Sequence, residues 1–224
     1  MPCDYHLLPH EGIQSLSPYI PGKSAETLAE EMGITNITKL ASNENPLGCS
    51  PLVNQALAEV SSTKIAAYPV SNHMPLRHKI AQRIGVMADM ITLGNGSDGL
   101  FPVLQTCFAL HCDKHILTHE YAFIAYGIHA KTLGIPVVKT PLRSDWKVDI
   151  DVMIEACNEK TALIFLPNPN NPTGLPVDLD DIIRLLQNIP ISTILILDLA
   201  YHEYMSNWEQ SNTLSLLTHY PNLI

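Results

Sequence analysis

The chain has 224 residues, of which 46% are hydrophobic and 16% charged, a balance typical of a globular protein with a packed core. Its 13 basic and 22 acidic side chains give a formal net charge of -9. This acidic balance excludes the basic surface that nucleic acids and anionic membranes require, so we expect neither as a partner.

The first 45 residues are rich in proline, glycine and polar positions. Pro18, Pro21 and Gly22 interrupt the only early apolar cluster. We therefore expect an amino-terminal arm over residues 1–45, extended in structure. The rest of the chain, residues 46–224, is expected to form one large domain.

Beyond residue 45, stretches with helical periodicity alternate with short apolar runs. The expected helices are Pro51–Ser61, Met74–Ile84, Ser97–Ala109, Phe123–Leu133, Ile150–Cys157 and Leu179–Asn188. The expected strands are His115–Thr118, Pro136–Thr140, Thr161–Leu166 and Thr193–Leu197, and another begins at Asn222–Ile224. This alternation predicts an α/β fold: a doubly wound, mostly parallel sheet with helices on both faces and ligands at the carboxyl ends of the strands.

A glycine-rich segment, Gly94–Gly99, precedes one of the predicted helices. Its glycines allow the backbone to approach a phosphate closely, Ser97 can cap the helix, and a helix amino terminus favours an anion. An N-capped turn without a ligand explains the same residues. For the segment taken alone, we favour the N-capped turn over phosphate binding.

A second cluster, Pro167–Gly174, directly follows the strand that ends at Leu166. Its three prolines restrict the backbone, so an asparagine amide between them loses little entropy when it binds a ligand. A tight turn explains the prolines and glycine but not the two adjacent asparagines before Pro172. We therefore favour a binding role for Asn171.

A carboxylate and a phenol follow the next predicted strand. Asp198 stands at the strand end and can hold a pyridine nitrogen in its protonated form. Tyr201 comes three residues later, within reach of the same ligand. A helix cap for Asp198 and a position at the edge of the core for Tyr201 are equally good explanations.

Aromatic residues follow the strand His115–Thr118. Phe123 could stack on a flat ring, a contact worth about 0.5–1.5 kcal/mol beyond area burial. Tyr126, three residues later, fits an apolar helix face, and we predict that structural role for it.

In this order, the clusters resemble the fold-type I pyridoxal-phosphate aminotransferases. The early stretch Lys39–Gly48 narrows the resemblance to the histidinol-phosphate aminotransferase family. Its run Asn43-Glu44-Asn45-Pro46 and the later run Asn170-Asn171-Pro172-Thr173-Gly174 are specific together. The likeness extends from about Ile13 to the end of the chain. Two positions depart from the family pattern: Gly99 and Leu199 stand where the family usually has acidic residues.

The resemblance implies pyridoxal 5'-phosphate as the cofactor and assigns roles by position. Ser97 and Asp98 resemble its phosphate contacts, and Phe123 resembles the ring that stacks on the pyridine. Asn171 and Tyr201 resemble the partners of the ring's 3-oxygen, and Asp198 that of its nitrogen. Tyr68 resembles the tyrosine that reaches the phosphate of the neighbouring subunit in a homodimer, and Tyr19 and Asn45 resemble substrate-binding residues.

The family's Schiff-base lysine follows the strand that Asn222–Ile224 is expected to begin, and none of the nine lysines here matches it. We therefore expect an incomplete portion of the enzyme, truncated before that lysine, with no catalytic residue of its own and no activity alone. The implied complete reaction is transamination between histidinol phosphate and 2-oxoglutarate in histidine biosynthesis. The alternatives are another enzyme of the same fold, a phospho-amino-acid decarboxylase or an aromatic aminotransferase, or a non-catalytic truncated protein.

The five cysteines are odd in number and scattered, so we expect reduced thiols and no metal site. Cys107 and Cys112 are expected to be small buried apolar residues. No secretory leader and no apolar run long enough to cross a bilayer is recognisable, which favours a cytoplasmic location.

Overall fold

The computed structural model describes residues 8–17, 23–70, 72–206 and 213–224. The chain forms two compact units, one of residues 1–16 with 75–224 and one of residues 17–74. The predicted boundary after residue 45 lies inside the second unit, and it stays a prediction. None of the helices in the described part of the chain has the length and apolar character needed to cross a membrane.

The larger unit is built around a parallel sheet of four strands in the order β2-β1-β3-β4. The strands are β1 His115–His119, β2 Val137–Thr140, β3 Thr161–Pro167 and β4 Ile194–Asp198. All seven residues of β3 are buried, as expected of a central parallel strand covered on both faces. The predicted doubly wound α/β fold is confirmed.

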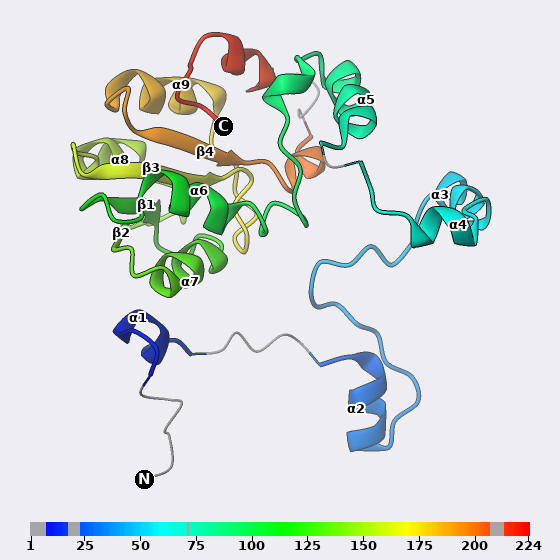
Figure 1. Cartoon of the computed structure of the whole chain (residues 1–224). Helices are drawn as coiled ribbons and strands as arrows, with labels where there is room; N and C mark the ends of the chain where they lie inside the picture. Colours follow the sequence, from blue (N-terminus) through cyan, green and yellow to red (C-terminus); the bar gives the residue numbers. More distant parts are fainter. Residues whose placement is uncertain (1–7, 18–22, 71, 207–212) are drawn as a thin grey trace. The chain divides into compact units, whose positions relative to one another are not determined.

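Helices cover both faces of this sheet (Figure 1). Within the described residues, the helices of the larger unit are α1 Glu11–Gln14, α5 Met74–Ile84 (whose first residue is counted with the other unit), α6 Phe101–Phe108, α7 Ala125–Thr132, α8 Ile150–Ala156 and α9 Leu179–Asn188, with short 3-10 helices at Ala88–Met90, His202–Tyr204 and Thr213–Thr218. Leu163 and Phe165 of β3 pack with α6 and α7, whereas Ile164 and Leu166 pack with α8 and α9. The alternation of side chains along one strand therefore supplies two cores.

Helix α9 shows why its sequence forms an amphipathic helix. Ile182, Leu185 and Leu186 share the buried face, and Arg184 on the other face forms ion pairs with Asp151 and Asp181. The predicted bounds of α9 and α5 are those observed, and the other predicted helices and strands differ only at their ends.

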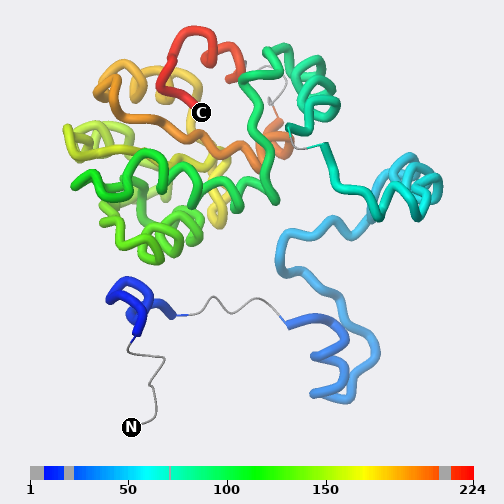
Figure 2. Tube along the Cα trace, in the orientation of Figure 1, coloured from blue at the N-terminus to red at the C-terminus, as the bar shows by residue number. Residues whose placement is uncertain are grey.

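The segment after the last 3-10 helix runs beside β4, as Figure 2 traces along the backbone. The amide of Leu195 donates to the carbonyl of Asn222 at 2.8 Å, and the amide of Ile224 donates to the carbonyl of Leu195 at 2.9 Å. Leu195 and Leu223 form a parallel bridge. The segment expected to begin a strand at Asn222 therefore pairs with β4 in parallel, through one isolated bridge rather than a full strand.

Three expectations from the sequence were wrong in detail: the start and cap of helix α6, the burial of two cysteines, and the extended structure of the amino-terminal arm. Helix α6 begins at Phe101, one turn after Ser97, and its N-cap residue Leu100 makes no side-chain cap, so Ser97 does not cap the helix. Cys107 and Cys112 are exposed because both lie away from the core face, on or just after α6.

The expected extended arm contains the helices α1 and α2 Ala25–Met32. Helix α2 forms because Ser24 caps its amino terminus, where its hydroxyl accepts from the amide of Thr27, and Gly33 ends it at a φ of 67°. The smaller unit also contains α3 Pro51–Ala58 and α4 Ser62–Ala66, and none of the helices α2, α3 and α4 has a buried residue.

Candidate functional site

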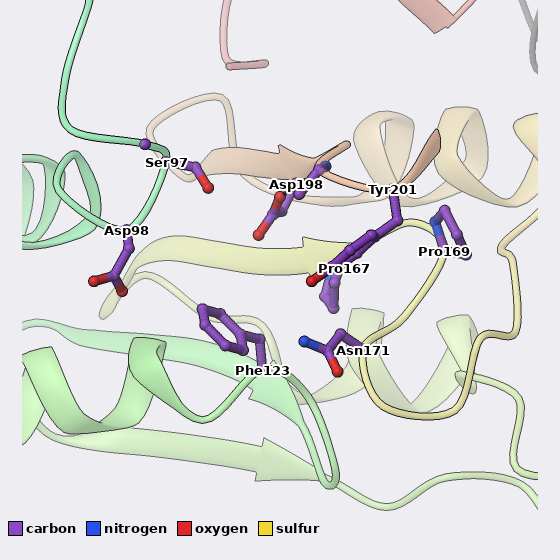
Figure 3. A pocket seen from close by; sticks show the side chains of 10 residues that line it. Ser97, Asp98, Phe123, Pro167, Pro169, Asn171, Asp198 and Tyr201 are labelled. Atoms are coloured by element: carbon purple, nitrogen blue, oxygen red, sulfur yellow. Dashed lines mark hydrogen bonds between the residues drawn. The ribbon is translucent and has the colours of Figure 1, made fainter. Parts of the chain in front are cut away.

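A pocket of about 180 Å³ lies at the carboxyl ends of β3 and β4, next to the segment that follows β1. Its lining residues are Gly96, Ser97, Asp98, Phe123, Pro167, Pro169, Asn171, Asp198, Ala200 and Tyr201. Six residues predicted from the sequence to contact a cofactor thus surround one space, although they come from segments as far apart as residues 97 and 201. In Figure 3 the side chains of Asp198, Asn171 and Tyr201 extend toward the region that Phe123 borders.

The pairing of β3 with β4 positions two lining residues of the pocket, Pro167 and Asp198. Pro167 lies in register with Asp198, and the amide of Asn168 donates to the carbonyl of Asp198 at 2.8 Å. The buried side chain of Asn168 bonds both the amide and the carbonyl of Val177, at 2.9 and 3.1 Å. These contacts hold the turn after β3 against the end of β4.

The two asparagines of this turn have different surroundings. The amide nitrogen of Asn170 is buried and donates to the carbonyl of Tyr121 at 3.1 Å and to Thr173 Oγ1 at 2.9 Å. Asn171 is half-buried and lines the pocket, and within the described part of the chain its side-chain amide makes no hydrogen bond. Asn170 therefore holds the turn in place, and Asn171 has an amide available to a ligand.

The carboxylate of Asp198 receives two hydrogen bonds from different elements. Its Oδ1 accepts from the amide of Ala200 at 3.1 Å, and its Oδ2 accepts from the hydroxyl of Tyr126 in α7 at 2.6 Å. Burial, and then the charge and hydrogen bond of Asp198, raise the pKa of Tyr126 well above its ordinary value. Tyr126 thus remains a neutral donor to a carboxylate at the wall of the pocket.

Sequence reasoning missed this contact because it assigned Tyr126 to an apolar helix face. The ring does lie in the core, but its hydroxyl reaches the site. The sequence did contain a signal for this contact, because the hydroxyl of a buried tyrosine usually has a hydrogen-bond partner. Asp198, predicted at the adjacent strand end, was a candidate acceptor.

The segment Gly94–Gly99 forms a series of turns before α6, with Gly96 at a φ of 68°. The carbonyl of Ser97 accepts from the amides of Leu100 and Phe101. Among the described residues, the backbone amides from Asn95 to Gly99 donate to no group of the chain. The loop therefore presents unpaired donors beside the pocket, which suits an anion.

Asp98, in the same loop, lines the pocket and also faces α7. Its carboxylate lies 3.1 Å from His129 Nε2. This contact joins the loop to the helix that carries Tyr126.

Phe123 precedes α7 and borders the pocket. Its ring meets that of Tyr126 edge to face, with 5.7 Å between centroids and an angle of 85°. The residue that could stack on a flat ligand is therefore supported by the residue that bonds Asp198.

The structure does not test three of the predicted residues. Tyr19 lies outside the described residues. Asn45 and Tyr68 belong to the smaller unit, where Asn45 bonds the carbonyl of Gly48 and the amide of Leu47, and Tyr68 is fully exposed. The substrate and dimer roles of these three residues stay predictions.

Comparison with known proteins adds independent findings. The family model described as aminotransferase class I and II matches residues 35–224. Histidinol-phosphate aminotransferase 2 of Legionella pneumophila strain Lens is 51% identical over 224 residues, which are 100% of this chain and 61% of that protein. Histidinol-phosphate aminotransferase 2 of Haemophilus influenzae strain KW20 is 40% identical over 220 residues, or 98% of this chain and 59% of that protein. The chain thus spans about three fifths of the length of these curated relatives.

Two solved structures resemble the fold. The structure of a putative histidinol-phosphate aminotransferase from Erwinia carotovora atroseptica has a TM-score of 0.72 and 28% identity, and the match covers 81% of this chain and 53% of that one. Histidinol-phosphate aminotransferase from Sinorhizobium meliloti, solved in complex with pyridoxal-5'-phosphate, has a TM-score of 0.74 and 24% identity, with coverage of 87% and 51%. Both matches cover about half of the solved chain.

Proposed function

The chain belongs to the class I and II aminotransferase family, and from that premise we propose that it forms the pyridoxal-phosphate-binding part of an aminotransferase. The observation that carries the proposal is the pocket itself. Its lining combines a carboxylate, a side-chain amide, a phenol, an aromatic ring and a loop whose backbone amides are unpaired among the described residues. A phosphorylated pyridine ring with an oxygen substituent offers a partner for each of them.

The chemistry of the pocket fits this cofactor. The backbone amides of Gly96, Ser97 and Asp98 suit a phosphate, because unpaired backbone donors and the helix that follows them favour an anion. The carboxylate of Asp198 suits a protonated ring nitrogen, because each charge stabilises the other.

The remaining contacts orient the ring. The half-buried Asn171 and Tyr201 can bond an oxygen at the ring edge, and Phe123 can lie against the ring face. When bound, the cofactor supplies an electron sink for the amino-bearing carbon of the substrate. The residues of this chain bind the cofactor, hold it in one orientation and keep a proton at its ring nitrogen.

We further propose histidinol phosphate as the amino donor and a 2-oxo acid, 2-oxoglutarate, as the acceptor, in histidine biosynthesis. The identity of 51% to a histidinol-phosphate aminotransferase, over every residue of this chain, supports this donor over a phospho-amino acid or an aromatic amino acid. Tyr19 and Asn45 are proposed to contact the donor.

The proposed enzyme is a cytoplasmic homodimer in which Tyr68 contacts the cofactor phosphate of the partner subunit. The full exposure of the Tyr68 side chain in this single chain supports such a role. The lysine that carries the cofactor is proposed to lie in the part of the relatives outside the match, because no lysine lines the described pocket.

The experiment is a transamination assay on a completed chain. The part of the Legionella relative that lies outside the match is fused to residues 1–224, and glutamate formation is followed with histidinol phosphate and 2-oxoglutarate. We expect turnover that the change Asp198→Ala reduces by at least about a hundredfold, since a charged partner of the ring is lost. Turnover with another amino donor but none with histidinol phosphate would replace the proposed substrate.

A further inference from the structure

We propose that Tyr126 is a positioning residue, whose buried hydroxyl holds the carboxylate of Asp198 in the orientation that binds the protonated nitrogen of a pyridine ring. This inference rests on the proposed function and deepens it. Tyr126 does not line the pocket and is not proposed to touch the ligand.

The geometry of the carboxylate is the first argument. The hydroxyl of Tyr126 donates to Oδ2 of Asp198 at 2.6 Å, the short distance of a hydrogen bond to a charged acceptor. The amide of Ala200 donates to the other oxygen at 3.1 Å. Each carboxylate oxygen can accept more than one hydrogen bond, so two donors fix the group and leave capacity for a ligand.

The second argument is that packing contacts hold the phenol ring of Tyr126 in place. The ring of Tyr126 is 0% exposed and stacks on Phe165, with 4.7 Å between centroids and an angle of 21°. Phe101 and Phe123 meet it edge to face at 4.9 and 5.7 Å. Contacts on several sides of the ring therefore hold the hydroxyl at one place.

The backbone of Tyr126 is held as well. The buried side chain of Gln105 in α6 donates to the carbonyl of Tyr126 at 3.0 Å. Helix α6 directly follows the Gly94–Gly99 loop. Tyr126 is therefore connected to the loop through α6, and it also contacts the ring of Phe123 and the carboxylate of Asp198. A displacement of Tyr126 would therefore shift the loop, the ring of Phe123 and the carboxylate of Asp198 in the proposed cofactor site.

The protonation state of the phenol suits this role. Burial and the nearby charge of Asp198 raise the pKa of Tyr126, so the hydroxyl keeps its proton and remains a donor. The competing explanation is that Asp198 merely satisfies a buried hydroxyl and that the contact serves the core alone. The two explanations differ in what the change Tyr126→Phe does to recognition of a ring nitrogen.

The test compares two probes. Pyridoxamine 5'-phosphate, which needs no lysine to bind, is titrated against the 224-residue chain by calorimetry, together with its analogue in which CH replaces the ring nitrogen. The wild-type chain is expected to prefer the pyridine compound. The change Tyr126→Phe keeps the ring and removes only the hydroxyl, and it is expected to reduce this preference at least about fivefold.

Two controls isolate the effect. Tyr204→Phe removes a hydroxyl from a side chain that is 81% exposed and should leave the preference unchanged. Asp198→Asn removes the charge, and in that background Tyr126→Phe should have no further effect on the preference, because the two residues act through one contact. Thermal melts of the wild-type chain and the four variants show whether each variant is folded.

The outcomes separate the inference from the proposed function. If the wild-type chain prefers the pyridine compound and Tyr126→Phe weakens both probes equally, or neither, Tyr126 has only a structural role and the inference is overturned. If the wild-type chain does not distinguish the probes, or binds neither, the proposed function of Asp198 fails and the inference fails with it. If Tyr126→Phe does not fold, Gln105→Met, which removes the hydrogen bond to the carbonyl of Tyr126, takes its place. A weaker preference for the pyridine compound in that variant supports the inference, and an unchanged preference overturns it.

Discussion

At the scale of single residues, two neighbouring asparagines in the turn after β3 have different roles: one holds the turn in place, and the other is available to bind a ligand. Asn170 is buried and bonds Tyr121 and Thr173 through its amide nitrogen, whereas Asn171 lines the pocket with its amide unpaired among the described residues. The same chemical group therefore serves two purposes at adjacent positions. Which purpose applies depends on the direction in which the backbone of the turn aims each side chain.

We predict opposite effects for alanine at these two positions. Asn170→Ala should lower the free energy of unfolding by about 1–3 kcal/mol, because buried hydrogen bonds are lost, and urea denaturation measures this. Asn171→Ala should change that free energy by less than about 0.5 kcal/mol and weaken pyridoxamine 5'-phosphate binding about fivefold. Equal losses of stability in the two variants would contradict the division of roles.

The pH dependence of stability provides a second prediction at this scale. The pKa of Tyr126 is raised in the folded chain, mainly by burial, whereas the unfolded chain releases this proton at about pH 10. The contribution to stability is therefore fully present below about pH 10 and declines as the pH rises above it. Between about pH 10 and 11.5 the free energy of unfolding of Tyr126→Phe should fall less steeply than that of the wild-type chain. Parallel slopes for these two chains in urea denaturation would show that the phenol ionises freely in the folded state.

Single residues also mark the limit of sequence reasoning. Asp198, Asn171 and Phe123 could be placed near one another because each follows a predicted strand. Tyr126 could not, since helical spacing shows that its ring belongs to the core but does not show where the end of a long side chain reaches. That position depends on Phe165 and Phe101, which come from other elements.

At the scale of elements, the strands and helices of residues 75–224 were predicted well because their patterns are strong. The buried run of β3 and the apolar face of α9 each identify one type of element. The start of α6 was placed one turn early, because Ser97 and the glycines look like a cap while the backbone forms turns until Leu100. Helix α2 was missed, although Ser24 and Gly33 are ordinary signals of its two ends.

The turns of Gly94–Gly99 depend on the backbone conformation of Gly96. Its φ of 68° is unfavourable for a residue with a side chain, and no heavy atom lies near the position of an added Cβ. Gly96→Ala should therefore cost about 1–2 kcal/mol of unfolding free energy through backbone strain alone. It should also weaken the binding of inorganic phosphate, which calorimetry measures.

Gly127 in α7 is the matched control. It also has open space around an added Cβ, but its φ is not positive, so Gly127→Ala should stabilise the chain by about 0.5–1 kcal/mol. Destabilisation of both variants by the same amount would contradict strain as the cause.

At the scale of the whole molecule, the two compact units differ in how much of their side-chain surface is buried. The larger unit holds both apolar cores and the pocket, whereas helices α2, α3 and α4 of the smaller unit have no buried residue. Asn45 and Tyr68 belong to that smaller unit. Sequence reasoning predicts roles for them from the resemblance alone, because nothing in the local pattern of either residue fixes where it lies relative to the sheet.

The central claim is that distant segments of the chain converge on one phosphorylated ring. The most direct measurement is a crystal structure of the chain with pyridoxamine 5'-phosphate. We predict one bound molecule with its ring against Phe123, its nitrogen at Asp198 and its phosphate at the loop of Gly96, Ser97 and Asp98. A molecule bound with its nitrogen away from Asp198, or outside this pocket altogether, would contradict the account.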